Sequence, residues 1–222
     1  MTASVAIKIC CIRSREEAQL AIAAGAAVLG LVSRMPSGPG VIDDELIADI
    51  VASVKPPTET FLLTARTQAD NIAAQHQHVR ASALQLVDHV PHEQLQRLRA
   101  LCPGVKLVQV IHVLGDASIA EALAVAPLVD AVLLDSGNPT LTVKVLGGTG
   151  RTHDWGRSRR IRDAVWPLPL YLAGGLNADN VAEAIATVQP FGLDLCSSVR
   201  RDDRLDAGRL ARFVDAVARC AT

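Results

Sequence analysis

The chain has 222 residues, half of them hydrophobic and a fifth charged, and its formal net charge is −1. This balance excludes a disordered chain, and it excludes the chain-wide positive field by which proteins hold nucleic acid or an anionic membrane surface. The longest apolar stretch, 21–32, is interrupted by glycine and falls short of the roughly 20 residues that span a bilayer. We therefore expect a globular protein with neither nucleic acid nor membrane as a partner.

The cysteines indicate the compartment. There are five of them, an odd number, and their spacing matches no metal motif: Cys10, Cys11, Cys102, Cys196 and Cys220. Unpaired thiols suit a reducing environment. Lys8 lies within the first apolar run, whereas the apolar part of a secretory leader is uncharged, so a leader is not expected. We expect a cytoplasmic protein without a metal site.

Apolar runs of strand length alternate with segments of helical periodicity from one end of the chain to the other. The expected strands cover 5–12, 27–33, 59–65, 83–87, 105–113, 131–135, 168–174 and 192–197. The expected helices cover 14–24, 43–54, 68–79, 92–101, 117–126, 154–164, 177–188 and 206–219. Ser14, Asn177 and Asp206 stand where helix N-caps are expected.

Eight successive strand–helix units predict a single (β/α)8 barrel over residues 1–222. The strands are almost continuously apolar, as parallel strands covered on both faces are. An open doubly wound sheet of this length usually has about five to seven strands, so the closed barrel is favoured. In such a barrel the functional groups lie at the carboxyl ends of the strands, and this rule selects the candidate residues.

Cys10 stands at the end of the first strand, where alternation makes one of two adjacent thiols face inward. Lys8 lies two residues earlier on the same face; it could activate that thiol as a base or nucleophile, and it is also a candidate substrate-binding residue. The alternative is that Cys10 is a small apolar filler of the core.

Asp135 ends the apolar sixth strand, where a carboxylate is costly to bury without a purpose. Its alternative role is a helix cap or a loop ion pair. If both residues face the barrel axis, Asp135 and Cys10 provide an acid and a base on two sides of a substrate.

Glycine-rich turns at 147–150 and 173–177 follow the sixth and seventh strands, and Ser197 and Ser198 follow the eighth. Glycine lets backbone N–H groups approach a phosphate closely, and barrels often bind phosphate between their last two strands. The predicted phosphate-binding residues are Gly148, Gly174, Gly175, Ser197 and Ser198.

These strand ends resemble, in order and spacing, the phosphoribosylanthranilate isomerase family, a barrel of tryptophan biosynthesis, over nearly the whole chain. The matching residues are Lys8-Ile9-Cys10, Leu133-Leu134-Asp135, Gly147-Gly148-Thr149-Gly150 with Asp154-Trp155, Ala173-Gly174-Gly175-Leu176-Asn177 with Asn180-Val181, and Asp194 with Ser197. The resemblance implies an aldose–ketose isomerase that needs no cofactor and acts on a phosphorylated small molecule. It implies Cys10 as general base and Asp135 as general acid of an Amadori rearrangement, in a monomer or a homodimer.

The sequence departs from the family where the aromatic half of the substrate is held. The family's loop after the second strand has an Arg for the anthranilate carboxylate, whereas loop 35–41 here has none, and Arg34 is the candidate substitute. Cys11 and Ser198 each stand in place of a family glycine. Two alternatives therefore remain open: a paralogue that handles another phosphosugar-type ligand, and a non-catalytic sensor barrel.

Overall fold

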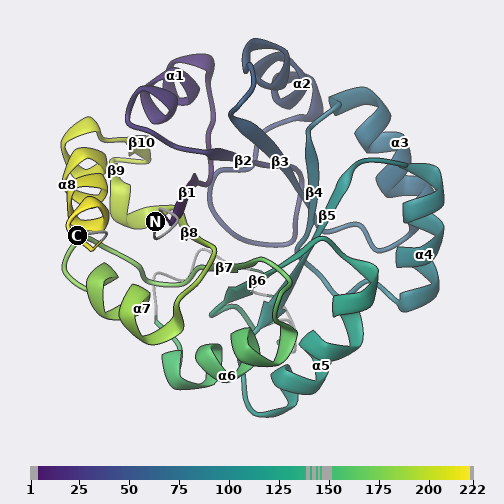
Figure 1. Ribbon diagram of the computed structural model, residues 1–222. Coiled ribbons are helices and arrows are strands. Elements are labelled where there is room, and N and C mark those ends of the chain that lie inside the picture. The colour runs from purple at the N-terminus through teal and green to yellow at the C-terminus, as the bar shows by residue number, and fades with distance from the viewer. Residues whose placement is uncertain (1–4, 139–140, 142–143, 145, 147–151, 221–222) are drawn as a thin grey trace.

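The computed structural model describes residues 5–138, 141, 144, 146 and 152–220. Parallel strands close into a barrel in the order of the chain, β1 next to β8 (Figure 1). The barrel strands are β1 (Ala6–Ile9), β2 (Val28–Val32), β3 (Glu59–Thr64), β4 (Ala83–Leu86), β5 (Lys106–His112), β6 (Ala131–Asp135), β7 (Leu170–Leu172) and β8 (Gly192–Leu195). The predicted (β/α)8 architecture is confirmed.

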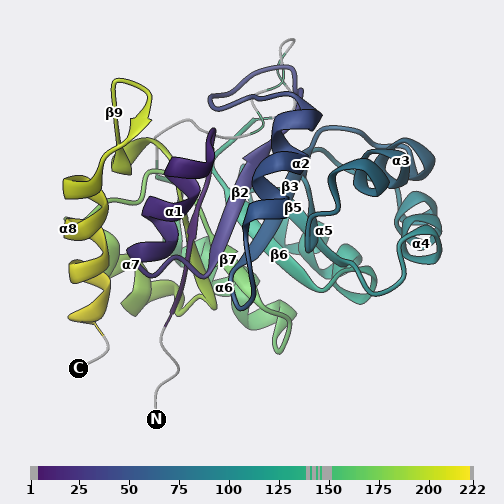
Figure 2. The same ribbon diagram turned by 90° about the horizontal axis from the view of Figure 1, so that it is seen from above.

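A ring of helices surrounds the barrel, one after each strand, and stands alongside the strands in the side view (Figure 2). The helices are α1 (Arg15–Ala23), α2 (Asp44–Ser53), α3 (Ala69–Val79), α4 (His92–Leu101), α5 (Ala117–Val125), α6 (Trp155–Val165), α7 (Val181–Val188) and α8 (Ala207–Ala218). Short elements lie beside them: the 3-10 turns η1 (Ala126–Leu128) and η2 (Ser197–Val199), and a hairpin of β9 (Arg200–Arg201) and β10 (Arg204–Leu205).

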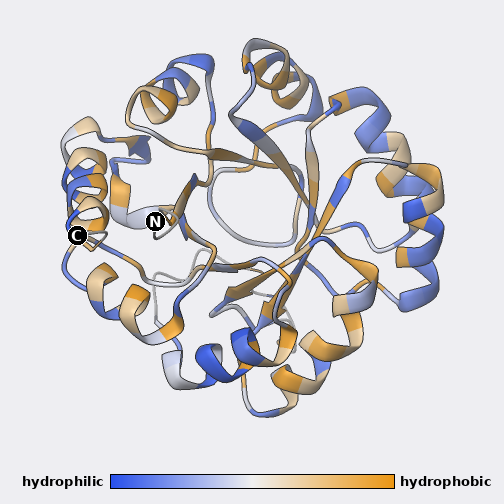
Figure 3. Cartoon of the chain, in the orientation of Figure 1, coloured by the Kyte–Doolittle hydropathy of each residue, from blue (hydrophilic) through white to orange (hydrophobic). Residues whose placement is uncertain are grey.

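Two apolar clusters hold the fold together. The larger fills the layer between the strands and the helices and includes Ile47, Ile72, Leu84 and Phe213. The smaller fills the barrel interior, with Val28, Phe61 and Tyr171 among its members. Hydrophobic colour accordingly concentrates on the strands and on the inner faces of the helices (Figure 3). The rigid wall that results positions the strand ends.

Several predicted boundaries were wrong at the carboxyl ends of strands. Strand β1 stops at Ile9 rather than at residue 12, and β8 stops at Leu195 rather than at 197, because Ser197 begins the turn η2. Apolar residues continue here beyond the last hydrogen bonds between the strands, so hydropathy alone overestimates the length of each strand.

The predicted start of the seventh helix was also wrong. Helix α7 begins at Val181, and Asn177 lies before it in a turn in which its Oδ1 accepts hydrogen bonds from the backbone N–H groups of Asp179 and Asn180. Ser14 and Asp206 do cap α1 and α8, by accepting from the N–H groups of Glu17 and Arg209. An Asx turn and an N-cap have the same sequence signal, which explains the error at Asn177.

No helix in the described part of the chain is both long enough and apolar enough to cross a bilayer.

Candidate active site

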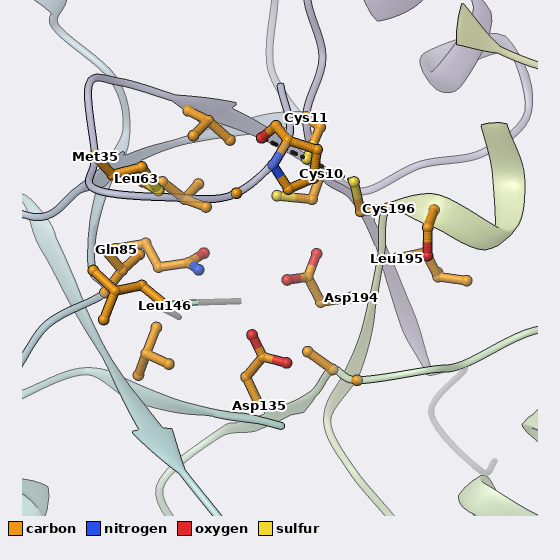
Figure 4. A pocket seen from close by; sticks show the side chains of 18 of the residues that line it. Cys10, Cys11, Met35, Leu63, Gln85, Asp135, Leu146, Asp194, Leu195 and Cys196 are labelled. Atoms are coloured by element: carbon orange, nitrogen blue, oxygen red, sulfur yellow. Dashed lines mark hydrogen bonds between the residues drawn. The ribbon is translucent and has the colours of Figure 1, made fainter. Parts of the chain in front are cut away.

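A cavity of about 720 Å³, part of it open to solvent, lies at the carboxyl ends of the barrel strands. Cys10 and Asp135, which the sequence singled out, both line it, and Figure 4 shows their side chains on opposite sides of the space. Cys10 directly follows β1 and Asp135 ends β6, so barrel closure is what brings the two together. The cavity thus holds the predicted acid–base pair.

Cys10 follows β1 directly, and its thiol is close to a buried ion pair. Lys8 is fully buried and its Nζ lies 2.7 Å from Oδ1 of Asp194, its register partner on β8. Burial alone would lower the pKa of Lys8, but the charge and hydrogen bond of Asp194, together with Cys10 and Cys11, outweigh it and the pKa is raised. The ammonium therefore remains charged and interacts electrostatically with Cys10.

The space around this pair depends on Gly30 of β2. A Cβ at Gly30 would lie 2.9 Å from Sγ of Cys10 and 3.0 Å from Nζ of Lys8. Since real Cβ atoms almost never make such contacts, a side chain at this position would displace the thiol or the ammonium.

Asp135 is buried at the end of β6, and its Oδ1 accepts a hydrogen bond from the backbone N–H of Ser136 at 2.7 Å. Burial raises the pKa of Asp135 to about 6, helped by the negative charge of Asp194 and opposed by Ser136 and Lys8. A carboxyl group with such a pKa holds a proton for part of the time near neutral pH and can act as a general acid.

Gly174, Gly175, Ser197 and Ser198 line the cavity on the loops after β7 and β8. Both glycines have positive φ, 85° and 64°, a conformation that other residues adopt at a cost. An adjoining depression shares Gly175, Ser197 and Ser198 and is also lined by Arg209 and Arg212 of α8. Gly148, the fifth predicted phosphate-binding residue, lies outside the described residues.

The opposite part of the lining is apolar and comes from β2, β3, β5 and the loops after β2, β4 and β6: Val32, Met35, Leu63, Val87, Val110 and Leu146. A flat aromatic group suits such a surface. Gln85 of β4 adds a polar atom, because its Oε1 is buried and has no hydrogen-bond partner among the described residues. The sequence signal for Gln85 was one polar residue in the middle of an apolar strand.

Arg34, the predicted substitute for the missing family Arg, is exposed and is absent from the described lining of the cavity. Lys144 lies two residues before Leu146 of the lining, and its Nζ is 2.5 Å from Oδ2 of Asp88, which follows Val87 of the lining. Ser37 donates a hydrogen bond to the carbonyl of Lys144 and so joins the two loops that flank this part of the cavity. Asp88 neutralises the Lys144 charge in this arrangement.

Two features were not predicted from the sequence: the contact between Cys11 and Cys196, and the burial of Arg200. Cys196 lines the cavity with Cys11, and their sulfur atoms lie 2.7 Å apart (Figure 4). Arg200, which is buried, donates hydrogen bonds to the carbonyl oxygens of Cys10 and Cys11, and both of its terminal nitrogens contact the carboxylate of Glu17 at 3.0 Å. In sequence Arg200 looks like one more surface arginine, because nothing local indicates its burial.

Comparison with known proteins identifies the relatives of this barrel. Residues 7–216 match the family model described as N-(5'-phosphoribosyl)anthranilate (PRA) isomerase. The N-(5'-phosphoribosyl)anthranilate isomerase of Methanocella arvoryzae is 34% identical over 214 residues, which are 95% of this chain and 97% of that protein.

Solved structures agree. The phosphoribosyl anthranilate isomerase of Thermotoga maritima is 26% identical, with a TM-score of 0.82 over 96% of this chain and 98% of that one. A second isomerase structure, 24% identical, has a TM-score of 0.79 over the same shares of the two chains; its crystals contain reduced 1-(o-carboxyphenylamino)-1-deoxyribulose 5-phosphate. This chain belongs to the N-(5'-phosphoribosyl)anthranilate isomerase family of aldose–ketose isomerases.

Proposed function

We propose that this chain isomerises N-(5'-phosphoribosyl)anthranilate to the corresponding ketose in tryptophan biosynthesis, with Asp135 as general acid and Cys10 as general base. The observation that carries the proposal is the placement of these two groups on opposite sides of one cavity. An Amadori rearrangement needs a proton delivered at one atom of the sugar and another removed at a neighbouring carbon.

The steps follow from that placement. Asp135 protonates the ring oxygen of the ribosyl group, the C1–O bond breaks, and the anthranilate nitrogen shares its electron pair with C1 to form an iminium ion. Cys10 then removes the C2 proton, the electron pair of the C–H bond neutralises the iminium, and the resulting enolamine tautomerises to the aminoketose. Lys8 supplies a positive charge beside Cys10, and Asp194 keeps Lys8 in place.

The rest of the cavity supports a phosphorylated sugar with an aromatic aglycone. Gly174, Gly175, Ser197 and Ser198 offer N–H and hydroxyl groups to a phosphate, and Arg209 and Arg212 add positive charge next to them. All of these residues come from one chain, so a monomer or a homodimer can carry the activity. Cys10 must stay reduced to act as a base, which favours the cytoplasm.

The test follows the fluorescence of freshly generated phosphoribosylanthranilate, which is lost on isomerisation. The wild-type chain should turn it over, and Cys10→Ser and Asp135→Asn should each lose roughly two to four orders of magnitude in kcat. The matched cell test is growth of a tryptophan auxotroph that lacks this isomerase. Wild-type turnover no faster than that of Cys10→Ser would refute the proposal.

A second candidate is a related N-phosphoribosyl amine whose aglycone lacks the carboxylate. It is favoured by the cavity, since neither Arg nor Lys occurs in its described lining and Asp88 already pairs with Lys144. Leaving a buried carboxylate without its cation costs on the order of 2–5 kcal/mol. A kcat/KM for N-phosphoribosylaniline above that for phosphoribosylanthranilate would favour this candidate.

A further inference from the structure

The mouth of the cavity carries two thiols that the proposed reaction does not use. Cys11 follows the residue after β1, and Cys196 follows β8, the strand that pairs with β1. Their sulfur atoms are 2.7 Å apart, closer than two sulfur atoms that merely pack, and the side chains point toward each other in Figure 4. Both line the cavity, where Cys196 is half-buried and Cys11 is buried, so a small solute in the cavity approaches Cys196 first.

The backbone at Cys11 is in a conformation that disfavours a side chain. Its φ is 63°, in the left-handed region that glycine adopts freely and other residues rarely do. The thiol finds room only because residue 40 is a glycine: a Cβ there would lie 2.4 Å from Cβ of Cys11. A side chain kept at a strained position needs an explanation, and this one contacts the sulfur of Cys196 and the carbonyl oxygen of Pro39.

The surroundings divide the roles of the two thiols. The hydrogen bond with Cys11 lowers the pKa of Cys196, burial opposes this, and the Arg200 guanidinium lowers it further. The pKa of Cys11 is raised by its hydrogen bonds with Cys10 and Cys196 and by burial. Of the two thiols, Cys196 therefore loses its proton more readily and Cys11 keeps it more firmly.

We propose that Cys11 and Cys196 form a peroxide-sensitive, reversible disulfide at the mouth of the active site, and that closing it slows isomerisation. The Cys196 thiolate attacks hydrogen peroxide, the O–O bond breaks, and a sulfenic acid and hydroxide result. The Cys11 sulfur then attacks the Cys196 sulfur, a disulfide forms, and the sulfenic oxygen leaves as water with the Cys11 proton. A dithiol reductant reverses the reaction by thiol–disulfide exchange.

The consequence for catalysis comes from the neighbours of the two thiols. Cys10 precedes Cys11 and Ser197 follows Cys196, so the link ties the proposed base to the proposed phosphate loop. It also removes the S–H that Cys11 donates to the carbonyl of Pro39 at 3.6 Å. We expect kcat/KM of the linked form to fall by about tenfold or more, because small displacements of reacting groups carry such penalties.

The test treats the full chain with hydrogen peroxide and maps disulfides by mass spectrometry of non-reduced tryptic peptides. Trypsin cuts after Lys8 and Arg13, which leaves Cys10 and Cys11 in one peptide, so Cys10→Ser assigns the link to Cys11. Cys11→Gly and Cys196→Val should abolish it. Cys102→Ala with Cys220→Ala is the matched control, because both thiols lie outside the cavity lining, and it should link like the wild type.

The expected result is a Cys11–Cys196 peptide pair that has lost two hydrogens, gained no oxygen and separates in dithiothreitol. The isomerase activity of the disulfide-linked enzyme is then compared before and after reduction. Stable oxidation of single thiols, a link that requires Cys10, or a linked enzyme with unchanged kcat/KM would each overturn the proposal. The mass measurement does not use the isomerase assay, so its failure is distinguishable from failure of the proposed function.

Discussion

At the scale of single residues, Asp135 shows how a functional group costs stability. Its carboxyl group is buried, and its pKa of about 6 lies above the ordinary value of 3.8 because burial penalises the charged form. Between these two pH values the folded chain binds a proton that the unfolded chain has released. The contribution of Asp135 to the free energy of unfolding is therefore fully present below about pH 4, and it is lost as the pH rises through about 6.

Replacing Asp135 by Asn should remove this loss. The difference between the two pKa values corresponds to at most about 3 kcal/mol, so Asp135→Asn should raise the free energy of unfolding by up to that amount at pH 8. At pH 4 the variant and the wild type should be equally stable. Urea unfolding across the pH range measures the difference, and a gap that stayed constant with pH would contradict the assigned titration.

At the scale of elements, a buried ion pair joins β1 to β8 where the barrel closes. Lys8 and Asp194 are register partners, and their side chains are 0% and 8% exposed. Removal of one partner from a buried pair leaves an uncompensated charge, which costs about 3–5 kcal/mol.

Lys8→Met should therefore lower the free energy of unfolding by that amount, and the double variant Lys8→Met with Asp194→Leu should recover much of the loss. Denaturant unfolding of both variants near neutral pH is the measurement. Destabilisation of Lys8→Met by less than about 1 kcal/mol would show that the pair is not essential for closure.

A second contact between elements joins the end of β1 to α1 through Arg200. Its guanidinium contacts the carboxylate of Glu17 on α1 and the carbonyl oxygens of Cys10 and Cys11. Arg200 is thus a positioning residue for the proposed base, since it fixes the backbone that carries the thiol.

Arg200→Met should reduce kcat by about tenfold or more and raise KM less, because misplacement of a reacting group affects the chemical step most. Arg200→Lys keeps the ion pair with Glu17 and should restore part of kcat. Steady-state kinetics of both variants, with circular dichroism to confirm folding, checks this. If Arg200→Met lost stability but kept its kcat, the role of Arg200 would be purely structural.

At the scale of the whole molecule, stability and function lie in different layers. The large apolar cluster between strands and helices holds the fold, whereas the cavity lies at the strand ends inside the ring. Ile72 of α3 is fully buried in that outer layer and does not line the cavity.

Ile72→Ala should lower the free energy of unfolding by about 2–5 kcal/mol, through lost burial and the cavity it leaves. Its kcat/KM at 25 °C should equal that of the wild type, since Ile72 is not among the cavity residues. Thermal unfolding and the isomerase assay on one preparation test both statements. A matching loss in kcat/KM would mean that the layers are coupled.

The sequence by itself determined the architecture and the list of candidate groups. Eight strand–helix alternations can be read locally, because hydrophobic periodicity reflects which face of each element is buried. The barrel rule then selected Cys10 and Asp135, and the family was recognised from motifs at the same strand ends. The ends of the strands and the first residue of α7 were predicted less accurately, because hydropathy reveals neither the hydrogen bonds between strands nor the Asx turn at Asn177.

Only the tertiary structure decided the environment of these groups. Lys8 meets Asp194 across 186 positions, Cys11 meets Cys196 across 185, and Arg200 reaches Cys10 across 190. Such contacts exist because the first and last strands pair when the barrel closes, and the raised pKa of Asp135 follows from burial in that closed interior. Composition and periodicity describe neighbours along the chain, whereas the chemistry of this cavity comes from neighbours across it.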